Sequence, residues 1–465
     1  MSKIQIGKQE IIHFIGIGGI GMSGLAQIMK TMGFNVQGSD INENKNTDNC
    51  KKLGIKILKG HSTKNISNAT IVVKSSAIKK NNTELSYSKK RKIPSYDRVE
   101  MLANIIDLKK NIIITGSHGK TTTTSLVAKI ISTARLDPTI INGGVINSLK
   151  NNAKLGKGDW AIVEADESDG SFLKVPINYS IVTNVDKEHL DFYKNFSNLI
   201  AAFIIFIEKT PPIGKCFICI DDINIKKIIR KLKTKNYYTY GFDTKANYQI
   251  CNTKYSIGST KFDLKIKNII SKNLHIKNIS LKLIGKYNVL NASAAIALCL
   301  NLGLKTKIIK KALKNFSGVE RRLTKVFKKN KIEFYDDYAH HPTEIKSVLE
   351  AVRKVATNRK IITIFQPHRY SRLRALKSEF TKCFKDADQL ILCPVYPAGE
   401  PIDKKFNPIK LAKLISKFSK VQVIIIEDEL DIANYLRKNL INDEIVIGMG
   451  AGSISKWMHN LKNNL

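Results

Sequence analysis

A phosphate-binding loop stands between an apolar strand and a helix, and this feature constrains the fold more than any other. The stretch "NIIITGSHGKTTTTSL" (residues 111–126) places Gly116, Gly119, Lys120 and Thr121 directly after a run of isoleucines. In α/β proteins such a loop surrounds phosphates with backbone N–H groups, while the lysine neutralises charge and the hydroxyl can hold Mg²⁺. Only two residues separate the glycines here, which still permits these contacts. The loop therefore predicts an ATP site at the end of a sheet strand.

A second glycine-rich loop lies near the start of the chain, in "IIHFIGIGGIGMSGLA" (residues 11–26). Gly16, Gly18 and Gly21 separate an apolar strand from a helix, and Asp40 ends the next strand. Glycines at this spacing let backbone N–H groups approach a pyrophosphate, whose charge the helix N-terminus favours. The pattern requires a diphosphate joined to a ribose, so NAD and a UDP-sugar both satisfy it. A tight turn without a ligand is the structural alternative.

Strands and helices alternate along the chain, which predicts an α/β protein of three domains in series. Residues 1–108 are expected to form a Rossmann-like domain around the first loop. Residues 109–324 are expected to form a P-loop ATPase-like domain with a mixed sheet that includes short alternating strands such as "TKFDLKIK". Residues 325–465, beginning with the strand "KIEFYDDY", are expected to form a second Rossmann-like domain.

The 77 lysines and arginines against 39 acids give a formal net charge of +38, which raises the question of a nucleic-acid partner. Lysine is abundant in every segment, including surface helices such as "NIKKIIRKLKTKN", and no basic block is set apart. We therefore expect only weak, non-specific attraction to polyanions. Seven scattered cysteines, the absence of a bilayer-length apolar run and the polar N-terminal residues predict a cytoplasmic protein with free thiols and no membrane contact.

Two classes of ATP-using protein fit the second loop. In a nucleic-acid-associated ATPase, the acids of "DWAIVEADES" would form a Walker-B-like segment. In a ligase, the same acids would hold Mg²⁺ while ATP phosphorylates a substrate carboxylate. A motor protein has no need of a separate domain for a nucleotide diphosphate, so the first loop favours the ligase.

A series of motifs that covers essentially the whole chain resembles the Mur ligases of peptidoglycan synthesis. These motifs are "HFIGIGGIGMSGLA", "TGSHGKTTTT", "EADESDGSFL", "TNVDKEHLDFY", "GKYNVLNA", "GVERRL", "YDDYAHHPTEI", "FQPHRYSR" and "VYPAGEPI". The resemblance implies an ATP-dependent ligase that joins L-alanine to the carboxylate of UDP-N-acetylmuramate through an acyl phosphate, with Mg²⁺ as cofactor. It also implies that the C-terminal domain closes on ATP and the amino acid. A related ligase that attaches a murein tripeptide to the same sugar nucleotide is the alternative within the family.

The resemblance further implies roles for individual residues. The UDP-sugar is expected at Gly16, Gly18, Gly19, Gly21, Asp40 and Ser75. ATP is expected at Gly116, Ser117, His118, Gly119, Lys120, Thr121, Thr122, Asn288, Asn291, Arg322 and Asp337. The metal ion is expected at Thr121, Glu164 and His189, and the catalytic groups are expected to be Lys120, His340, Arg369 and Arg372.

The chain departs from the family pattern at two places. Tyr287 stands where the family usually has a histidine before Asn288, and its ring could stack on adenine. The stretch "NLIAAFIIFIE" has no lysine where some sister ligases carry a carbamylated one, so none is expected. The catalytic and metal candidates also have plain structural alternatives, as a polar pair at a helix start, as surface charges or as a loop histidine.

Overall fold

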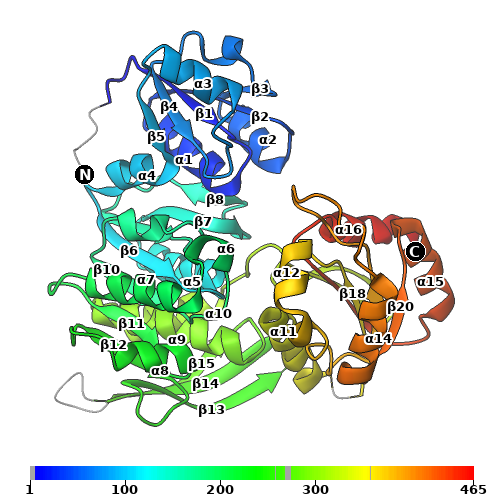
Figure 1. The fold of residues 1–465 in the computed structure, drawn as a ribbon. Helices are drawn as coiled ribbons and strands as arrows, with labels where there is room; N and C mark the ends of the chain where they lie inside the picture. Colours follow the sequence, from blue (N-terminus) through cyan, green and yellow to red (C-terminus); the bar gives the residue numbers. More distant parts are fainter. Residues whose placement is uncertain (1–5, 257, 268–273, 357) are drawn as a thin grey trace. The chain divides into compact units, whose positions relative to one another are not determined.

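The computed structural model describes residues 6–256, 258–267, 274–356 and 358–465 (Figure 1). The chain divides into two compact units, and each unit combines segments that are separate in the sequence. The first unit consists of Met1–Thr253, Lys261–Leu281 and Leu290–Ser317. The second unit consists of Lys254–Thr260, Lys282–Val289 and Gly318–Leu465.

The N-terminal sheet of the first unit carries the first glycine loop. Within the described residues its strands are β1 (Ile11–Ile15), β2 (Asn35–Asp40), β3 (Lys56–Lys59), β4 (Ile71–Lys74) and β5 (Ser95–Asp97), in the order β3-β2-β1-β4-β5. Its helices are α1 (Ile20–Thr31), α2 (Lys45–Lys52), α3 (Thr83–Lys90) and α4 (Arg98–Ile106). All pairings are parallel, and β1 pairs with both β2 and β4. The strand order reverses at β1, so its carboxyl end lies where open α/β sheets bind ligands.

The central sheet carries the second glycine loop, after β6. Within the described residues its strands are β6 (Lys110–Thr115), β7 (Thr139–Ile146), β8 (Asn151–Lys154), β9 (Trp160–Glu164), β10 (Tyr179–Val182), β11 (Cys216–Cys219), β12 (Tyr237–Gly241), β13 (Tyr248–Ser256), β14 (Ser259–Ile266) and β15 (Leu274–Leu281). They lie in the order β15-β14-β13-β12-β11-β10-β6-β9-β7-β8. Strand β6 is parallel to β9 and β10, whereas β7 and β8 are antiparallel, so the sheet is mixed as predicted.

The helices of the central part are α5 (Lys120–Thr133), α6 (Leu190–Tyr193), α7 (Phe196–Glu208), α8 (Ile223–Ile229), α9 (Lys286–Asn301) and α10 (Thr306–Lys314). The isoleucines at positions 112–114 of β6 have no exposed surface, which explains why this strand is an unbroken apolar run instead of an alternating one. Among the described residues, no helix combines the length and the apolar character needed to cross a bilayer.

Helix α1 packs against β8, which joins the N-terminal sheet to the central one within the first unit. The Nδ2 of Asn152 in β8 donates to the carbonyl of Ile20 at 2.8 Å, and Asn151 donates to the side chain of Gln27. A Cβ on Gly24 would lie 2.9 Å from the Nδ2 of Asn152. The helix therefore needs glycine at this position for its close approach to the strand.

Strands and helices also alternate along the chain in the sheet of the second unit. Its described strands are β16 (Thr324–Lys329), β17 (Ile332–Asp337), β18 (Ile361–Phe365), β19 (Gln389–Leu392), β20 (Gln422–Ile425) and β21 (Ile445–Met449), in the order β16-β17-β21-β18-β19-β20. Its helices are α11 (Pro342–Val355), α12 (Tyr370–Ala375), α13 (Lys377–Phe380), α14 (Pro408–Ser419), α15 (Glu429–Asn439) and α16 (Ile454–Asn464). Alternate residues of β21 enter two different apolar clusters, Ile445 and Ile447 on one face and Val446 on the other.

The structure confirms the α/β class and the three sheets that the sequence predicts. Strand β16 was not predicted, because this edge strand is lysine-rich, has no buried residue and gives a weak apolar signal. Strand β16 pairs antiparallel with β17, whereas the other pairings of this sheet are parallel. The boundaries placed after residues 108 and 324 remain predictions.

Candidate functional site

The second glycine loop connects β6 to α5, and its two glycines have positive φ angles. Gly116 has φ 127°, and a Cβ there would lie 2.2 Å from the Oγ1 of Thr183. Gly119 has φ 83° and caps α5, and a Cβ there would lie 2.5 Å from the Oδ1 of Asn291. Both positions therefore need glycine for backbone conformation and for close packing.

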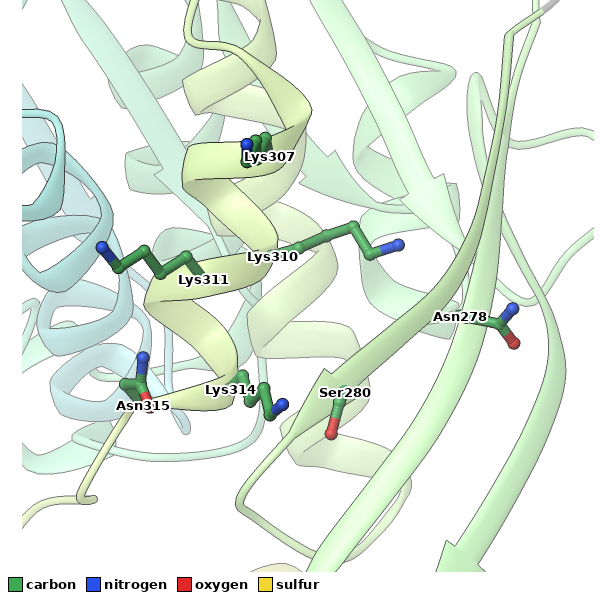
Figure 2. A pocket seen from close by; sticks show the side chains of 7 residues that line it. All are labelled: Asn278, Ser280, Lys307, Lys310, Lys311, Lys314 and Asn315. Atoms are coloured by element: carbon green, nitrogen blue, oxygen red, sulfur yellow. The ribbon is translucent and has the colours of Figure 1, made fainter.

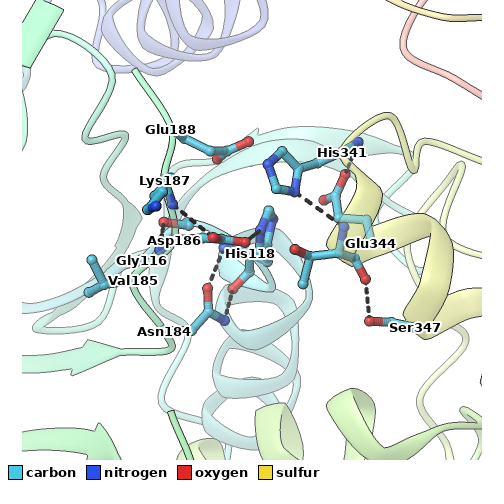
Figure 3. A network of polar contacts seen from close by, with 12 residues as sticks. Gly116, His118, Asn184, Val185, Asp186, Lys187, Glu188, His341, Glu344 and Ser347 are labelled. Atoms are coloured by element: carbon cyan, nitrogen blue, oxygen red, sulfur yellow. Dashed lines mark hydrogen bonds and ion pairs between the residues drawn. The ribbon is translucent and has the colours of Figure 1, made fainter. Parts of the chain in front are cut away.

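The segment after β10 holds this loop in place (Figure 3). The N–H of Ser117 donates to the carbonyl of Asn184 at 3.0 Å, and the N–H of His118 donates to the side-chain Oδ1 of Asn184 at 2.8 Å. The backbone carbonyl of His118 accepts from the side chains of Asn184 and Thr183. The Nε2 of the His118 ring lies 3.1 Å from the Oδ2 of Asp186. Two loop N–H groups are thus already bonded, so an anion would meet the N–H groups of the first turn of α5.

The ammonium group of Lys120 lies inside the loop. Its Nζ donates to the carbonyls of Gly116 at 2.7 Å and Ser117 at 3.2 Å, and to the Oε2 of Glu167 at 2.8 Å. Burial alone would lower the pKa of Lys120, but the carboxylates of Glu167 and Asp166 outweigh it and raise that pKa. Lys120 is therefore a fixed positive charge at the start of α5.

Glu164 ends β9 and contacts the same helix start. Its Oε1 accepts from the hydroxyl of Thr121 at 3.0 Å, and its Oε2 accepts from the N–H of Gly143 at 2.6 Å. Burial raises the pKa of Glu164, while Lys120 opposes this effect. The predicted metal candidates Thr121 and Glu164 therefore lie side by side.

Asp166, Glu167 and His189 form a group that could hold a divalent cation, with one ligand atom of each within 4.8 Å of the others. Glu167 is fully buried, and among the described residues its Oε1 has no hydrogen-bond partner, a deficit that a cation would relieve. The Nε2 of His189 lies 3.6 Å from that oxygen. The carboxylate oxygens suit Mg²⁺, so this group fits the ion. Glu164 is not a member of the group.

The first glycine loop is closed by Asp40 at the end of β2. The N–H of Gly18 donates to the Oδ2 of Asp40 at 2.8 Å, and Asn44 and Asn46 donate to the Gly18 carbonyl. Gly16 has φ 81°, and a Cβ there would lie 3.3 Å from the Cβ of Ser75. The structure thus brings Asp40 and Ser75 to the loop. It also shows that one oxygen of Asp40 already bonds the loop backbone.

Four polar side chains gather in the second unit after β17 and β18. The rings of His340 and His368 are 5.7 Å apart, and Arg372 donates to the His368 carbonyl at 3.3 Å. Arg369 precedes α12 with φ 69°, and its N–H donates to the carbonyl of Tyr396 at 2.9 Å. Burial lowers the pKa of His368 to about 3, and the neighbouring His340 and Arg372 side chains add to this shift. His368 was not predicted as a site residue, although it lies within the motif "FQPHRYSR".

Asp337 ends β17 and is buried. Its oxygens accept the N–H groups of Leu323 at 2.6 Å and Ala339 at 2.7 Å. Burial raises the pKa of Asp337 to about 6, although Arg322 opposes the shift. Arg322 lies 3.5 Å from Glu344 in the same unit. Asp337 therefore fastens the chain before β16 to the chain after β17.

The two asparagines of "YNVLNA" fall in different units. Asn291 lies beside Gly119 at the phosphate loop. Asn288 belongs to the second unit and donates to the carbonyl of Ile284 at 2.8 Å. Tyr287, which replaces the family histidine, is 40% exposed.

The predicted site residues are therefore divided between the two units. The first unit contains both glycine loops with Asp40, Ser75, Glu164, His189 and Asn291. The second unit contains Asn288, Arg322, Asp337, His340, Arg369 and Arg372. Their functional roles remain predictions. Glu167 was predicted only as one of several acids near Glu164, and Asn184 and Asp186 were not predicted, although all three follow the carboxyl ends of buried strands, where polar residues point to a site.

A separate pocket in the first unit, between α10 and β15, is lined by lysines (Figure 2). The lining residues that the structure describes carry no negative charge and are Lys307, Lys310, Lys311 and Lys314 of α10, with Asn278, Ser280 and Asn315. The helical spacing of three and four residues places these lysines on one face. The composition suggested evenly spread lysines, so this local concentration was not predicted.

Three family models match the chain in succession, and the chain belongs to the Mur ligase family. They are the Mur ligase family catalytic domain at residues 11–110, the Mur ligase middle domain at residues 114–299 and the Mur ligase glutamate ligase domain at residues 321–452. The fold and the family together define an ATP-dependent ligase of three domains.

Individual relatives indicate which ligases within the Mur family this chain is similar to. The UDP-N-acetylmuramate–L-alanine ligase of Pelagibacter ubique is 57% identical over 459 residues, which cover 99% of each chain. The crystal structure of UDP-N-acetylmuramate–alanine ligase from Thermotoga maritima superposes with a TM-score of 0.82 at 29% identity, covering 97% of this chain and 98% of that one. A murein peptide ligase from Psychrobacter arcticus superposes with a TM-score of 0.72 at 21% identity, covering 98% of each chain, and shows a shared fold only.

Proposed function

We propose that this protein uses ATP to join the amino group of L-alanine to the carboxylate of UDP-N-acetylmuramate, releasing ADP and phosphate. The observation that carries this conclusion is the presence of two glycine loops on two different sheets, of which only the second is followed by lysine and threonine. Two loops are what a ligase needs when it binds a nucleotide-linked substrate and ATP at the same time. The product is a peptidoglycan precursor, so the activity would serve cell-wall biogenesis, cell shape and cell division.

The first loop is the proposed site of the UDP moiety. Gly16, Gly18, Gly19 and Gly21 lie at the N-terminus of α1, where backbone N–H groups favour a diphosphate. One oxygen of Asp40 accepts from the N–H of Gly18, and the side-chain amide of Asn44 donates to the carbonyl of the same glycine. We propose that Asp40 shapes this loop and that Ser75, beside Gly16, contacts the sugar nucleotide.

The second loop is the proposed site of ATP. The N–H groups at the start of α5, together with Ser117, His118 and Thr122, would surround the β- and γ-phosphates, and Lys120 would neutralise them. Mg²⁺ would be held by Thr121, Glu164 and His189, with Asp166 and Glu167 within reach of the histidine. When bound, Mg²⁺ neutralises phosphate charge and favours attack by the carboxylate on the γ-phosphate. Asn288, Asn291, Arg322 and Asp337 are the proposed further contacts to ATP.

We propose that side chains of the second unit bind the amino acid. Arg369 and Arg372 would hold the carboxylate of alanine or the acyl phosphate, because a guanidinium group binds such anions through two parallel hydrogen bonds. His340, which lies beside His368, would contact the same reacting groups. The amine of alanine then attacks the acyl carbon, the bond to the phosphate oxygen breaks, and the departing phosphate takes up the proton that the amine loses.

The proposed domain limits are residues 1–108 for the UDP-sugar, 109–324 for ATP and 325–465 for closure on ATP and the amino acid. The proposed location is the cytoplasm, where ATP and the sugar nucleotide are available. No specific nucleic-acid partner and no membrane contact are proposed.

Phosphate release by the purified protein tests this function. With ATP and UDP-N-acetylmuramate present, we expect release to depend on L-alanine and to be much slower with glycine, L-serine or the murein tripeptide. Preference for the tripeptide would assign the chain to the related peptide ligase. Release that DNA or RNA stimulates without any amino acid would indicate a nucleic-acid-associated ATPase.

A further inference from the structure

A thiol, a carboxylate and an imidazole converge at the β15 end of the central sheet, and the ligase reaction does not use them. Cys251 lies on β13, Asp263 on β14 and His275 on β15, which are three adjacent strands. The cysteine sulfur, one aspartate oxygen and one histidine nitrogen all lie within 4.8 Å of one another. All three residues belong to the first unit.

The three atoms are spaced closely enough for one metal ion. Zinc holds sulfur, nitrogen and oxygen ligands at about 2.0–2.3 Å in a tetrahedron, which places the ligand atoms roughly 3.3–3.8 Å apart. The Nε2 of His275 is already 3.5 Å from the Oδ2 of Asp263. Small side-chain movements therefore suffice to bring all three onto a common ion.

The carboxylate is also oriented by its neighbours, as metal-bound carboxylates usually are. Its Oδ1 accepts the N–H of Asn278 at 2.7 Å, and its Oδ2 accepts from the Nδ2 of Asn252 at 2.8 Å. Both asparagines have positive φ angles, so each strand is locally distorted next to the group. Asp263 is only 9% exposed, while His275 is exposed and leaves the group open to solvent.

We propose that Cys251, Asp263 and His275 bind a thiophilic divalent cation of the zinc class, with solvent as the fourth ligand. The thiol releases its proton to solvent on binding, and the ion cross-links β13, β14 and β15. The site stabilises this end of the sheet and is separate from the candidate magnesium group at Glu167. The mixed sulfur, nitrogen and oxygen donors favour Zn²⁺ over Mg²⁺, which prefers oxygen ligands only.

Cobalt substitution tests the site on the full-length protein under reducing conditions. Co²⁺ bound through a thiolate gives a ligand-to-metal charge-transfer absorption in the near ultraviolet, and Zn²⁺ should abolish it by displacement. The other six cysteines are buried, so this signal reports on Cys251. We expect the signal in the wild type and in Glu167→Gln, and its loss in Cys251→Ser. His275→Ala should weaken Co²⁺ binding strongly.

Two further variants distinguish a metal site formed by all three side chains from metal binding by the Cys251 thiol alone. Asn252→Gly keeps the left-handed backbone but removes the amide that orients Asp263, and it should weaken Zn²⁺ binding by about 10- to 100-fold. Zn²⁺ should raise the Tm of the wild type but not that of Cys251→Ser, while ligase turnover without zinc stays the same in both. The proposal is overturned if Co²⁺ gives no thiolate signal, if the signal survives in Cys251→Ser, or if Asp263→Asn binds Zn²⁺ as tightly as the wild type.

Discussion

The ammonium group of Lys120 lies 2.8 Å from the Oε2 of Glu167, whose side chain is completely buried. The ion pair fixes the lysine at the start of α5, where it also bonds the Gly116 and Ser117 carbonyls. The positive charge is therefore held at the start of α5, where a helix N-terminus favours an anion.

Loss of the Lys120 charge should remove turnover. In Lys120→Met the apolar part of the side chain remains but the ammonium group is lost, and we expect kcat to fall by about 100-fold or more. Lys129→Met, on the same helix, is the matched control and should keep near-normal kcat. Steady-state kinetics at saturating ATP measure both, and near-normal turnover of Lys120→Met would refute the phosphate-loop assignment.

A methyl group at Gly18 should damage the sugar-nucleotide site selectively. A Cβ there would lie 2.8 Å from the Oδ2 of Asp40 and 2.9 Å from the Nδ2 of Asn44. Overpacking of about 1–3 kcal/mol corresponds to roughly 5- to 150-fold, so Gly18→Ala should raise the KM for UDP-N-acetylmuramate by a factor in that range. The KM for ATP should change little, and Gly7→Ala serves as a control. An equal increase in both KM values would mean that the first loop does not specifically serve UDP.

The strand–loop–helix order of both loops was predictable because each combines an apolar run, glycines and a helical pattern within a short segment. Lys120, Thr121 and Asp40 were found because their spacing from the glycines is fixed by that local geometry. Glu167 and Asn184 were not singled out, because their contacts join segments far apart in the chain and several acids and amides compete nearby. The lysine-rich edge strand β16 was missed for a related reason, since its pairing partner and not its own sequence defines it.

The Asp337 carboxyl should couple stability to pH. Its pKa is about 6 in the folded protein and close to 3.8 when exposed, so the folded state binds the proton more tightly. The stability that this proton contributes is present in full below about pH 4 and is lost as pH rises through about 6. The unfolding free energy of the wild type relative to Asp337→Asn should therefore fall between about pH 4 and pH 6. Urea unfolding of both proteins measures it, and a difference that stays constant or rises with pH would contradict the shift.

Replacement of Arg369 by lysine should separate binding from catalysis. Lysine keeps the charge but cannot form two parallel hydrogen bonds to a carboxylate. Arg369→Lys should bind ATP and UDP-N-acetylmuramate normally, lose turnover and require more L-alanine. Kinetics with each of the three substrates varied in turn provide the readout. A defect confined to the UDP-N-acetylmuramate KM would move Arg369 to the sugar-nucleotide site.

The lysine pocket on α10 should account for a measurable part of any polyanion binding. We expect a short DNA duplex to bind weakly and with a steep loss of affinity as salt increases, because the interaction is one of counterion release. Charge reversal in Lys310→Glu/Lys314→Glu should weaken this binding more than Lys227→Glu/Lys231→Glu on another surface. Fluorescence anisotropy across a salt series tests this. Sequence-preferring binding that persists at physiological salt would instead indicate a dedicated nucleic-acid site.

Oxygen transfer tests the central claim most directly. UDP-N-acetylmuramate labelled with ¹⁸O in its carboxylate is incubated with ATP, L-alanine and the enzyme, and the released phosphate is analysed by mass spectrometry. An acyl phosphate forms when a carboxylate oxygen attacks the γ-phosphorus, and attack by alanine then leaves that oxygen on the phosphate. We predict UDP-N-acetylmuramoyl-L-alanine together with phosphate that carries one labelled oxygen. Unlabelled phosphate, or phosphate release without the amide product, would contradict the account.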